Sequence, residues 1–217
     1  MTTFVLVPGA GGAGAYWHRV VELLDADGQT AAAIDLPGTD PEKGIVEYVE
    51  LVLAAAAGRD DVVLVAQSMG AFTALAACDR LAPERLVLLN AMIPAPGESA
   101  GDWWDNTGWE RPDSFTLETH FLHDVPAEAA AVLMEHAGDE ADIAFEQPCD
   151  FARWPDVPTT VLAGRDDRFF PLDFQRRVAR ERLGLDVVEL PGGHLNALSE
   201  PEAVASAVAS PSAARRR

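Results

Sequence analysis

Ser68 follows a strongly apolar run, and the small residues Ala66 and Gly70 lie two positions before and after it. The run Val62–Ala66 is typical of a buried strand, and the pattern of Met69–Leu81 predicts a helix directly after it. The segment Ala66-Gln67-Ser68-Met69-Gly70 therefore fits the pattern G-x-S-x-G of an activated serine, with alanine in the first glycine position. Such a turn exposes the serine oxygen near a helix N-terminus, which favours developing negative charge. The alternative is that Ser68 only caps the helix.

A carboxylate and a histidine follow two later apolar runs. Asp166 and Asp167 come after the predicted strand 157–163, and His194 follows Gly192 and Gly193 beyond the predicted strand 185–190. A histidine can take the serine proton, and a carboxylate can orient the imidazole. An aspartate pair alone is more typical of a solvated turn, and we expect His194 in a mobile loop rather than in a core. The chain order nucleophile, acid, histidine favours a catalytic set of Ser68, Asp167 and His194.

A glycine-rich turn follows the first apolar run, Thr3–Val7. It could aim a backbone amide at the space above Ser68, and the oxyanion donors that we expect are the amides of Ala10 and Met69. The competing interpretation is a phosphate-binding loop. The segment 9–14 is close to a dinucleotide-binding fingerprint, and Asp35 ends the next predicted strand, although a glycine-rich match alone is weak.

Short apolar runs alternate with amphipathic segments along most of the chain. The runs predict strands at 3–7, 30–36, 62–66, 85–89, 157–163 and 185–190, and helices at 15–24, 45–57, 69–81, 171–183 and 201–209. Continuous apolar strands separated by helices indicate an α/β fold with a mostly parallel, doubly wound sheet. Ligand sites in such folds lie at the carboxyl ends of the strands.

Residues 91–156 interrupt this alternation and contain four of the five tryptophans. We interpret them as a helical cap, with helical patches near 116–123 and 127–137, inserted into a single domain spanning 1–217. Trp103, Trp104 and Phe169 are candidates for the wall of an apolar substrate pocket. Residues 210–217 are expected to form a disordered tail.

Composition limits the partners and the location of the chain. The net charge of −19 disfavours nucleic acids and anionic membranes. No apolar run approaches the length of a membrane span, and the N-terminus lacks a signal-peptide pattern, so we expect a cytoplasmic protein. Cys78 and Cys149 are then expected to be free thiols. His120, His123 and His136 lie near carboxylates but form no complete metal-ligand set, so we expect neither a metal nor a cofactor.

At these motifs the chain resembles the α/β-hydrolase superfamily, and within it the small cap-bearing group of plant methyl-ester esterases and hydroxynitrile lyases. The resemblance implies about six parallel strands, because the first two strands of larger relatives are missing. The family spacing from Gly164 and Pro171 implies that Asp167, rather than Asp166, is the acid. The usual histidine after the first strand is Pro8 here. The lyases carry a lysine directly after the catalytic histidine, whereas this chain has Leu195.

The sequence therefore predicts a serine hydrolase that acts on a small apolar carboxylic ester through an acyl-enzyme. Two alternatives remain. One is a lyase or carbon–carbon hydrolase on the same fold, and the other is a ligand-binding protein that has lost the chemistry. The sequence does not indicate the natural substrate or the oligomeric state.

Overall fold

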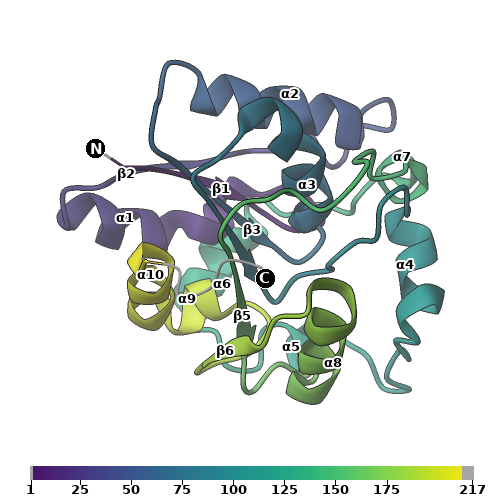
Figure 1. Cartoon of the computed structure of the whole chain (residues 1–217). Coiled ribbons are helices and arrows are strands. Elements are labelled where there is room, and N and C mark those ends of the chain that lie inside the picture. The colour runs from purple at the N-terminus through teal and green to yellow at the C-terminus, as the bar shows by residue number, and fades with distance from the viewer. Residues whose placement is uncertain (1, 212–217) are drawn as a thin grey trace.

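A six-stranded parallel sheet forms the centre of the computed structural model, which describes residues 2–211 (Figure 1). Its strand order is β2-β1-β3-β4-β5-β6, and every neighbouring pair is parallel. The predicted α/β class and the expected six strands are therefore confirmed. The strands are β1 (Thr3–Val7), β2 (Thr30–Ala33), β3 (Val62–Gln67), β4 (Arg85–Leu89), β5 (Thr159–Gly164) and β6 (Val187–Leu190).

Helices cover both faces of the sheet (Figure 1). One face packs against α2 (Ile45–Ala56), α3 (Gly70–Leu81) and α8 (Leu172–Leu183). The other packs against η1 (Gly14–Trp17), α1 (His18–Ala26), α9 (Asn196–Ser199) and α10 (Pro201–Ala209). Side chains of β3 alternate between these two cores: Leu64 belongs to the first and Val65 to the second. This double coverage explains why the central strands are continuous apolar runs.

Four helices lie between β4 and β5, within the segment that we expected to be a cap. They are α4 (Ala100–Thr107), α5 (Leu117–His120), α6 (Ala127–Met134) and α7 (Asp142–Glu146). Ser99 caps the N-terminus of α4: its side chain accepts a hydrogen bond from the Asp102 amide. Pro148, after α7, forms an isolated antiparallel bridge with Ser99. This bridge therefore joins the segment before α4 to the segment after α7.

Some local predictions differ from the structure. Strand β2 ends at Ala33 instead of Leu36, because the Leu36 amide turns to the Gly12 carbonyl. Ser210 is held by Arg85, which donates to its carbonyl, and so does not belong to a free tail; residues 212–217 of that prediction lie outside the described chain. Among residues 2–211, no helix has both the length and the apolar character needed to cross a bilayer.

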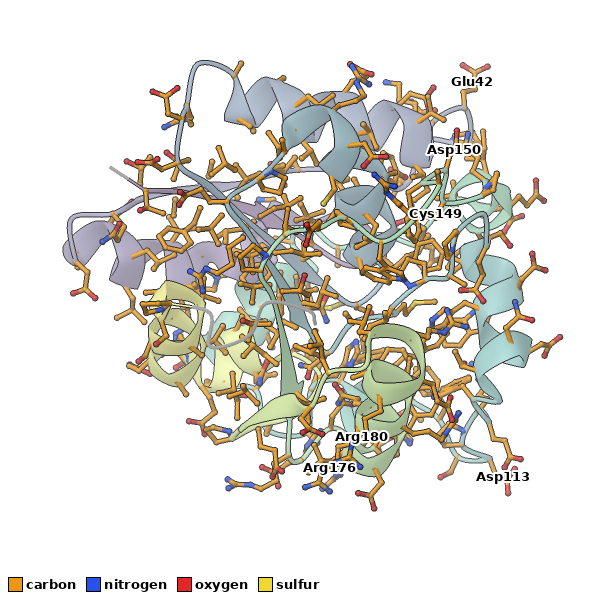
Figure 2. All side chains as sticks on the ribbon, viewed as in Figure 1. Glu42, Asp113, Cys149, Asp150, Arg176 and Arg180 are labelled. Carbon is orange, nitrogen blue, oxygen red and sulfur yellow. The ribbon has the colours of Figure 1, made fainter. Side chains whose placement is uncertain are left out.

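Side chains separate by polarity between the surface and the interior. Figure 2 shows Glu42 and Asp113 pointing away from the ribbon into solvent, whereas Cys149 is buried between the packed elements.

Cys78 and Cys149 are both buried free thiols, and the Cys149 thiol donates to the Phe72 carbonyl. Burial raises the pKa of the Cys78 thiol to about 12, and burial likewise raises that of Cys149. Both thiols therefore stay protonated and unreactive at neutral pH.

Candidate active site

Ser68 occupies a strained turn between β3 and α3. Its backbone φ is 49°, in the left-handed region that residues with a β-carbon rarely adopt. Close packing around the turn maintains this conformation. A β-carbon on Gly70 would lie 2.3 Å from the Pro8 carbonyl oxygen, and one on Gly9 would lie 2.9 Å from the Ser68 β-carbon. The glycines on both sides are therefore required so that β1 can approach the serine turn.

His194 joins Ser68 to Asp167 through its two ring nitrogens. The Nε2 atom lies 3.1 Å from Ser68 Oγ, and the Nδ1 atom lies 2.8 Å from Asp167 Oδ2. His194 is only 1% exposed, which corrects the expectation of a mobile, unpacked loop. The rings of Phe121, Phe169 and Phe170 surround the imidazole, with centroids 4.9–5.3 Å from its own.

The surroundings of Asp167 fix its carboxylate in place. One oxygen, Oδ1, accepts hydrogen bonds from the backbone amides of Phe169 and Phe170, both at 2.8 Å. The other oxygen faces His194 and also accepts a 3.3 Å bond from Gln175. Asp166 differs, since its side chain is half exposed and accepts from the Gly192 amide. Only one of the two adjacent carboxylates therefore contacts the imidazole.

The amides of Ala10 and Met69 have no hydrogen-bond partner among the described residues. Ala10 lies on the glycine-rich turn after β1 and lines the same cavity as Ser68, and Met69 directly follows the serine at the start of α3. Asp35, two residues after β2, accepts a 2.8 Å bond from the Gly14 amide and so supports this turn. This hydrogen bond gives Asp35 a structural role, which the dinucleotide-binding interpretation did not predict.

A cavity of about 460 Å³ opens above Ser68 and His194. Its walls are the turn after β1 on one side and helices α5 and α6 on the other. Most of the side chains in the outer wall are apolar, and the sequence interpretation did not identify them individually, although they lie within the helical patches that it predicted. They are Leu117, Phe121, Leu122, Leu133, Met134 and Ala137.

Trp103, Trp104 and Phe169 do not line this cavity, which corrects their expected role. Trp103 is fully buried, and its ring nitrogen donates to the Ile93 carbonyl. Trp104 contacts the rings of Trp103 and Phe169, with centroids 5.2 Å and 6.0 Å away. These rings form a cluster behind the imidazole, where Phe169 reaches His194. The number of tryptophans in the insert did not indicate which side of the histidine they would occupy.

The histidines of the insert are not brought together. His120 bonds to the Thr116 carbonyl and His136 to the Val132 carbonyl, each four residues earlier, and His123 lies 3.9 Å from Asp124. Within residues 2–211, no three histidine, cysteine, aspartate or glutamate side chains form a group that could hold a metal ion.

Comparison with known proteins gives several related hydrolases. A pyrethroid hydrolase of Sphingobium wenxiniae is 27% identical over 252 aligned positions, which cover 96% of this chain and 87% of the relative. The structure of polyneuridine aldehyde esterase superposes with a TM-score of 0.80 at 20% identity, covering 96% of this chain and 98% of the other. An Arabidopsis methylesterase gives 0.78 at 18% identity, with 96% and 97% covered.

The sequence profile described as the alpha/beta hydrolase family matches residues 4–207. This match spans the whole sheet, the insert and each of the loops that carry Ser68, Asp167 and His194. The resemblance noted from the sequence motifs is thereby confirmed, and the chain belongs to the alpha/beta hydrolase family.

Proposed function

We propose that this chain is a serine hydrolase that cleaves a small, apolar carboxylic ester, with Ser68 as nucleophile, His194 as general base and Asp167 as orienting acid. The observation that carries the proposal is one continuous chain of hydrogen bonds. It joins Ser68 Oγ to His194 Nε2 at 3.1 Å and His194 Nδ1 to Asp167 Oδ2 at 2.8 Å, at the floor of an apolar cavity. Both contacts are within hydrogen-bond reach, and the first allows the Ser68 proton to pass to His194.

In the acylation step, Ser68 Oγ attacks the ester carbonyl while its proton passes to His194 Nε2. The imidazolium then donates this proton to the leaving alcohol oxygen, and the carbon–oxygen bond of the ester breaks. A water molecule, deprotonated by His194, next attacks the acyl carbon, the bond from that carbon to Ser68 Oγ breaks, and His194 returns the proton to Oγ as the carboxylic acid leaves. Throughout, Asp167 accepts from Nδ1–H, selects the imidazole tautomer and stabilises the positive charge.

The amides of Ala10 and Met69 are the proposed donors to the oxyanion. Both are unpaired among the described residues, and they flank the Ser68 turn from β1 and from α3. Each donor of this kind stabilises the transition state by about 3 kcal/mol in other hydrolases. Since the donors are backbone groups, the loss of the family's usual histidine at Pro8 leaves this role unaffected.

The cavity supports a mainly apolar substrate without negative charge. Its volume of about 460 Å³ lies within the range of small-molecule sites, and its lining includes Asp139 but, among the described residues, no lysine or arginine. Leu195, directly after the histidine, contributes an apolar wall where the lyases of the group carry a lysine. Ester cleavage is therefore favoured over lyase chemistry. The names pyrethroid hydrolase and polyneuridine aldehyde esterase among the relatives support the same reaction class.

Hydrolysis of nitrophenyl esters of increasing acyl length tests this proposal. We expect turnover by the native chain and its loss in Ser68→Ala, with an unchanged melting temperature, because the substitution removes one oxygen at a turn. Ser114→Ala, at an exposed position of the insert, is the matched control and should keep full activity. Turnover of Ser68→Ala at the native rate would refute the proposed nucleophile.

A further inference from the structure

Two side-chain amides lie beneath the loop that carries His194. Gln67 is the last residue of β3, and Asn90 directly follows β4, which is the neighbouring strand. Both amides donate to the His194 carbonyl: Asn90 Nδ2 at 3.0 Å and Gln67 Nε2 at 3.3 Å. Asn90 is fully buried, and Gln67 is 3% exposed. Because buried amides are costly unless paired, these bonds are a stable part of the fold.

Asn90 also connects the histidine loop to the strand that precedes the acid. Its Oδ1 atom accepts a 2.6 Å bond from the amide of Gly164, which ends β5 three residues before Asp167. Its Nδ2 atom additionally contacts Asn196 Oδ1 at 3.1 Å, beyond the histidine. One side chain therefore spans the two segments that must bring Asp167 and His194 to within 2.8 Å of each other.

The backbone of Asn90 is strained in the same way as that of Ser68. Its φ is 45°, and asparagine tolerates this left-handed conformation better than most residues. The two strained turns are bonded to each other, since the Met92 amide donates to the Ser68 carbonyl at 3.0 Å. Strain of this kind persists where the surrounding structure holds it and is concentrated at functional sites.

We propose that Asn90, supported by Gln67, is a positioning residue that sets the place of His194 between Ser68 and Asp167. This inference rests on the proposed function. The loop before the histidine contains Gly192 and Gly193, which have no side chains to restrain it. The backbone carbonyl of His194 is held by hydrogen bonds from the side-chain amides of Asn90 and Gln67. A displacement of about 1 Å in a catalytic group can cost on the order of 100-fold in rate, so this restraint acts on catalysis.

Asn90→Asp is the sharpest test of the proposal. The aspartate keeps the shape, the tolerance of left-handed φ and the acceptor for Gly164, but it places an oxygen against the His194 carbonyl where a donor was. We expect kcat to fall about 10- to 100-fold with KM near the native value. We also expect loss of the far-downfield proton NMR signal of His194 Nδ1–H, which reports the bond to Asp167. Gln67→Glu should produce the same changes to a smaller extent.

Gln29→Glu, in the turn between α1 and β2, is the control because it adds the same charge at the opposite end of the strands from the histidine, and it should keep both kcat and the signal. Native kcat in Asn90→Asp, or a fall in kcat with the signal intact, would overturn the proposal. If Asn90→Asp does not fold, Gln67→Glu decides by the NMR signal, because Gln67 also lines the cavity and a charge there affects kcat directly. If the native chain proves to have no esterase activity, the proposed function fails, and the NMR signal in native and variant chains then decides the positioning role separately.

Discussion

At the scale of single residues, the two adjacent aspartates after β5 have opposite surroundings. Asp167 is 5% exposed and bonds to His194 and to two backbone amides, whereas the side chain of Asp166 is 54% exposed. Successive side chains in this turn point in different directions. The turn therefore presents a single carboxylate to the imidazole.

Asp167→Asn should lower kcat by up to about 10⁴-fold, because an amide favours the wrong imidazole tautomer and does not balance the imidazolium charge. Asp166→Asn is the neighbouring control, and it should cost far less because that carboxylate contacts only the Gly192 amide and Arg165. Steady-state kinetics of both variants on one ester measure the difference. If Asp166→Asn were the impaired variant, the proposed acid would be wrong by one residue.

Residues that belong to local patterns could be identified from the sequence, and residues defined by distant contacts could not. Ser68 and His194 each sit in a short motif whose neighbours reveal the turn. Asn90 follows an ordinary apolar strand, and its role depends on contacts with residues 74 and 104 positions away. Asn90 was missed, whereas Trp103 was wrongly assigned: its residue type suggested a pocket wall, but its packing places it in the core.

At the scale of elements, the turn after β1 is anchored by the segment of the insert between α6 and α7. Glu140 accepts a 2.6 Å bond from the Gly11 amide through one oxygen and a 2.6 Å bond from the Tyr48 hydroxyl through the other. Burial raises the pKa of the Glu140 carboxyl above its ordinary value of 4.5, and these two hydrogen bonds oppose the rise. This carboxylate thus links α2, the insert and the turn that contains Ala10.

The raised pKa of Glu140 predicts a pH dependence of stability. The folded chain binds a proton at Glu140 more readily than the unfolded chain, so this group lowers the free energy of unfolding as pH rises from 4.5 through the folded value. Glu140→Gln removes the titration. Denaturant unfolding of both chains across this range should show the variant gaining stability relative to the native chain as pH rises. A difference that stays constant or shrinks would contradict this assignment.

The order and type of the main elements could be predicted, because long apolar runs and helical periodicity are local signals. The C-terminal limit of β2 could not be predicted, since residues 34–36 have strand-like composition, but the Leu36 amide bonds to the Gly12 carbonyl instead of to β1. Helix α9 spans only Asn196–Ser199 and is too short to show a period. Within the insert, packing against the sheet decides the structure, and single-sequence patterns carry little information about such contacts.

At the scale of the whole molecule, the helices of the insert pack in two different places, the core and the cavity wall. Helix α4 places Trp103 in the core, against the rings of Phe170 and Phe174. Helices α5 and α6 instead form the outer wall of the cavity, where Leu133 is half-buried. We therefore expect stability and substrate choice to depend on different segments of the same insert.

Trp103→Ala should lower the free energy of unfolding by about 3–5 kcal/mol, because it leaves a large void in a packed core. Leu133→Ala should have a much smaller effect on stability but should shift the preferred acyl length by about tenfold in kcat/KM, since apolar pockets discriminate through such contacts. Thermal melts and an ester series measure both quantities for both variants. An altered acyl preference in a stable Trp103→Ala chain would contradict this division.

Covalent labelling with a fluorophosphonate tests the central claim most directly, because the reagent bonds preferentially to a serine whose oxygen is activated as a nucleophile. Mass spectrometry of the intact chain should show one phosphonyl adduct, with fluoride released, and peptide mapping should locate it on Ser68. The Ser68→Ala chain should remain unlabelled. A folded native chain that takes up no label, or that carries the adduct on another residue, would contradict the account.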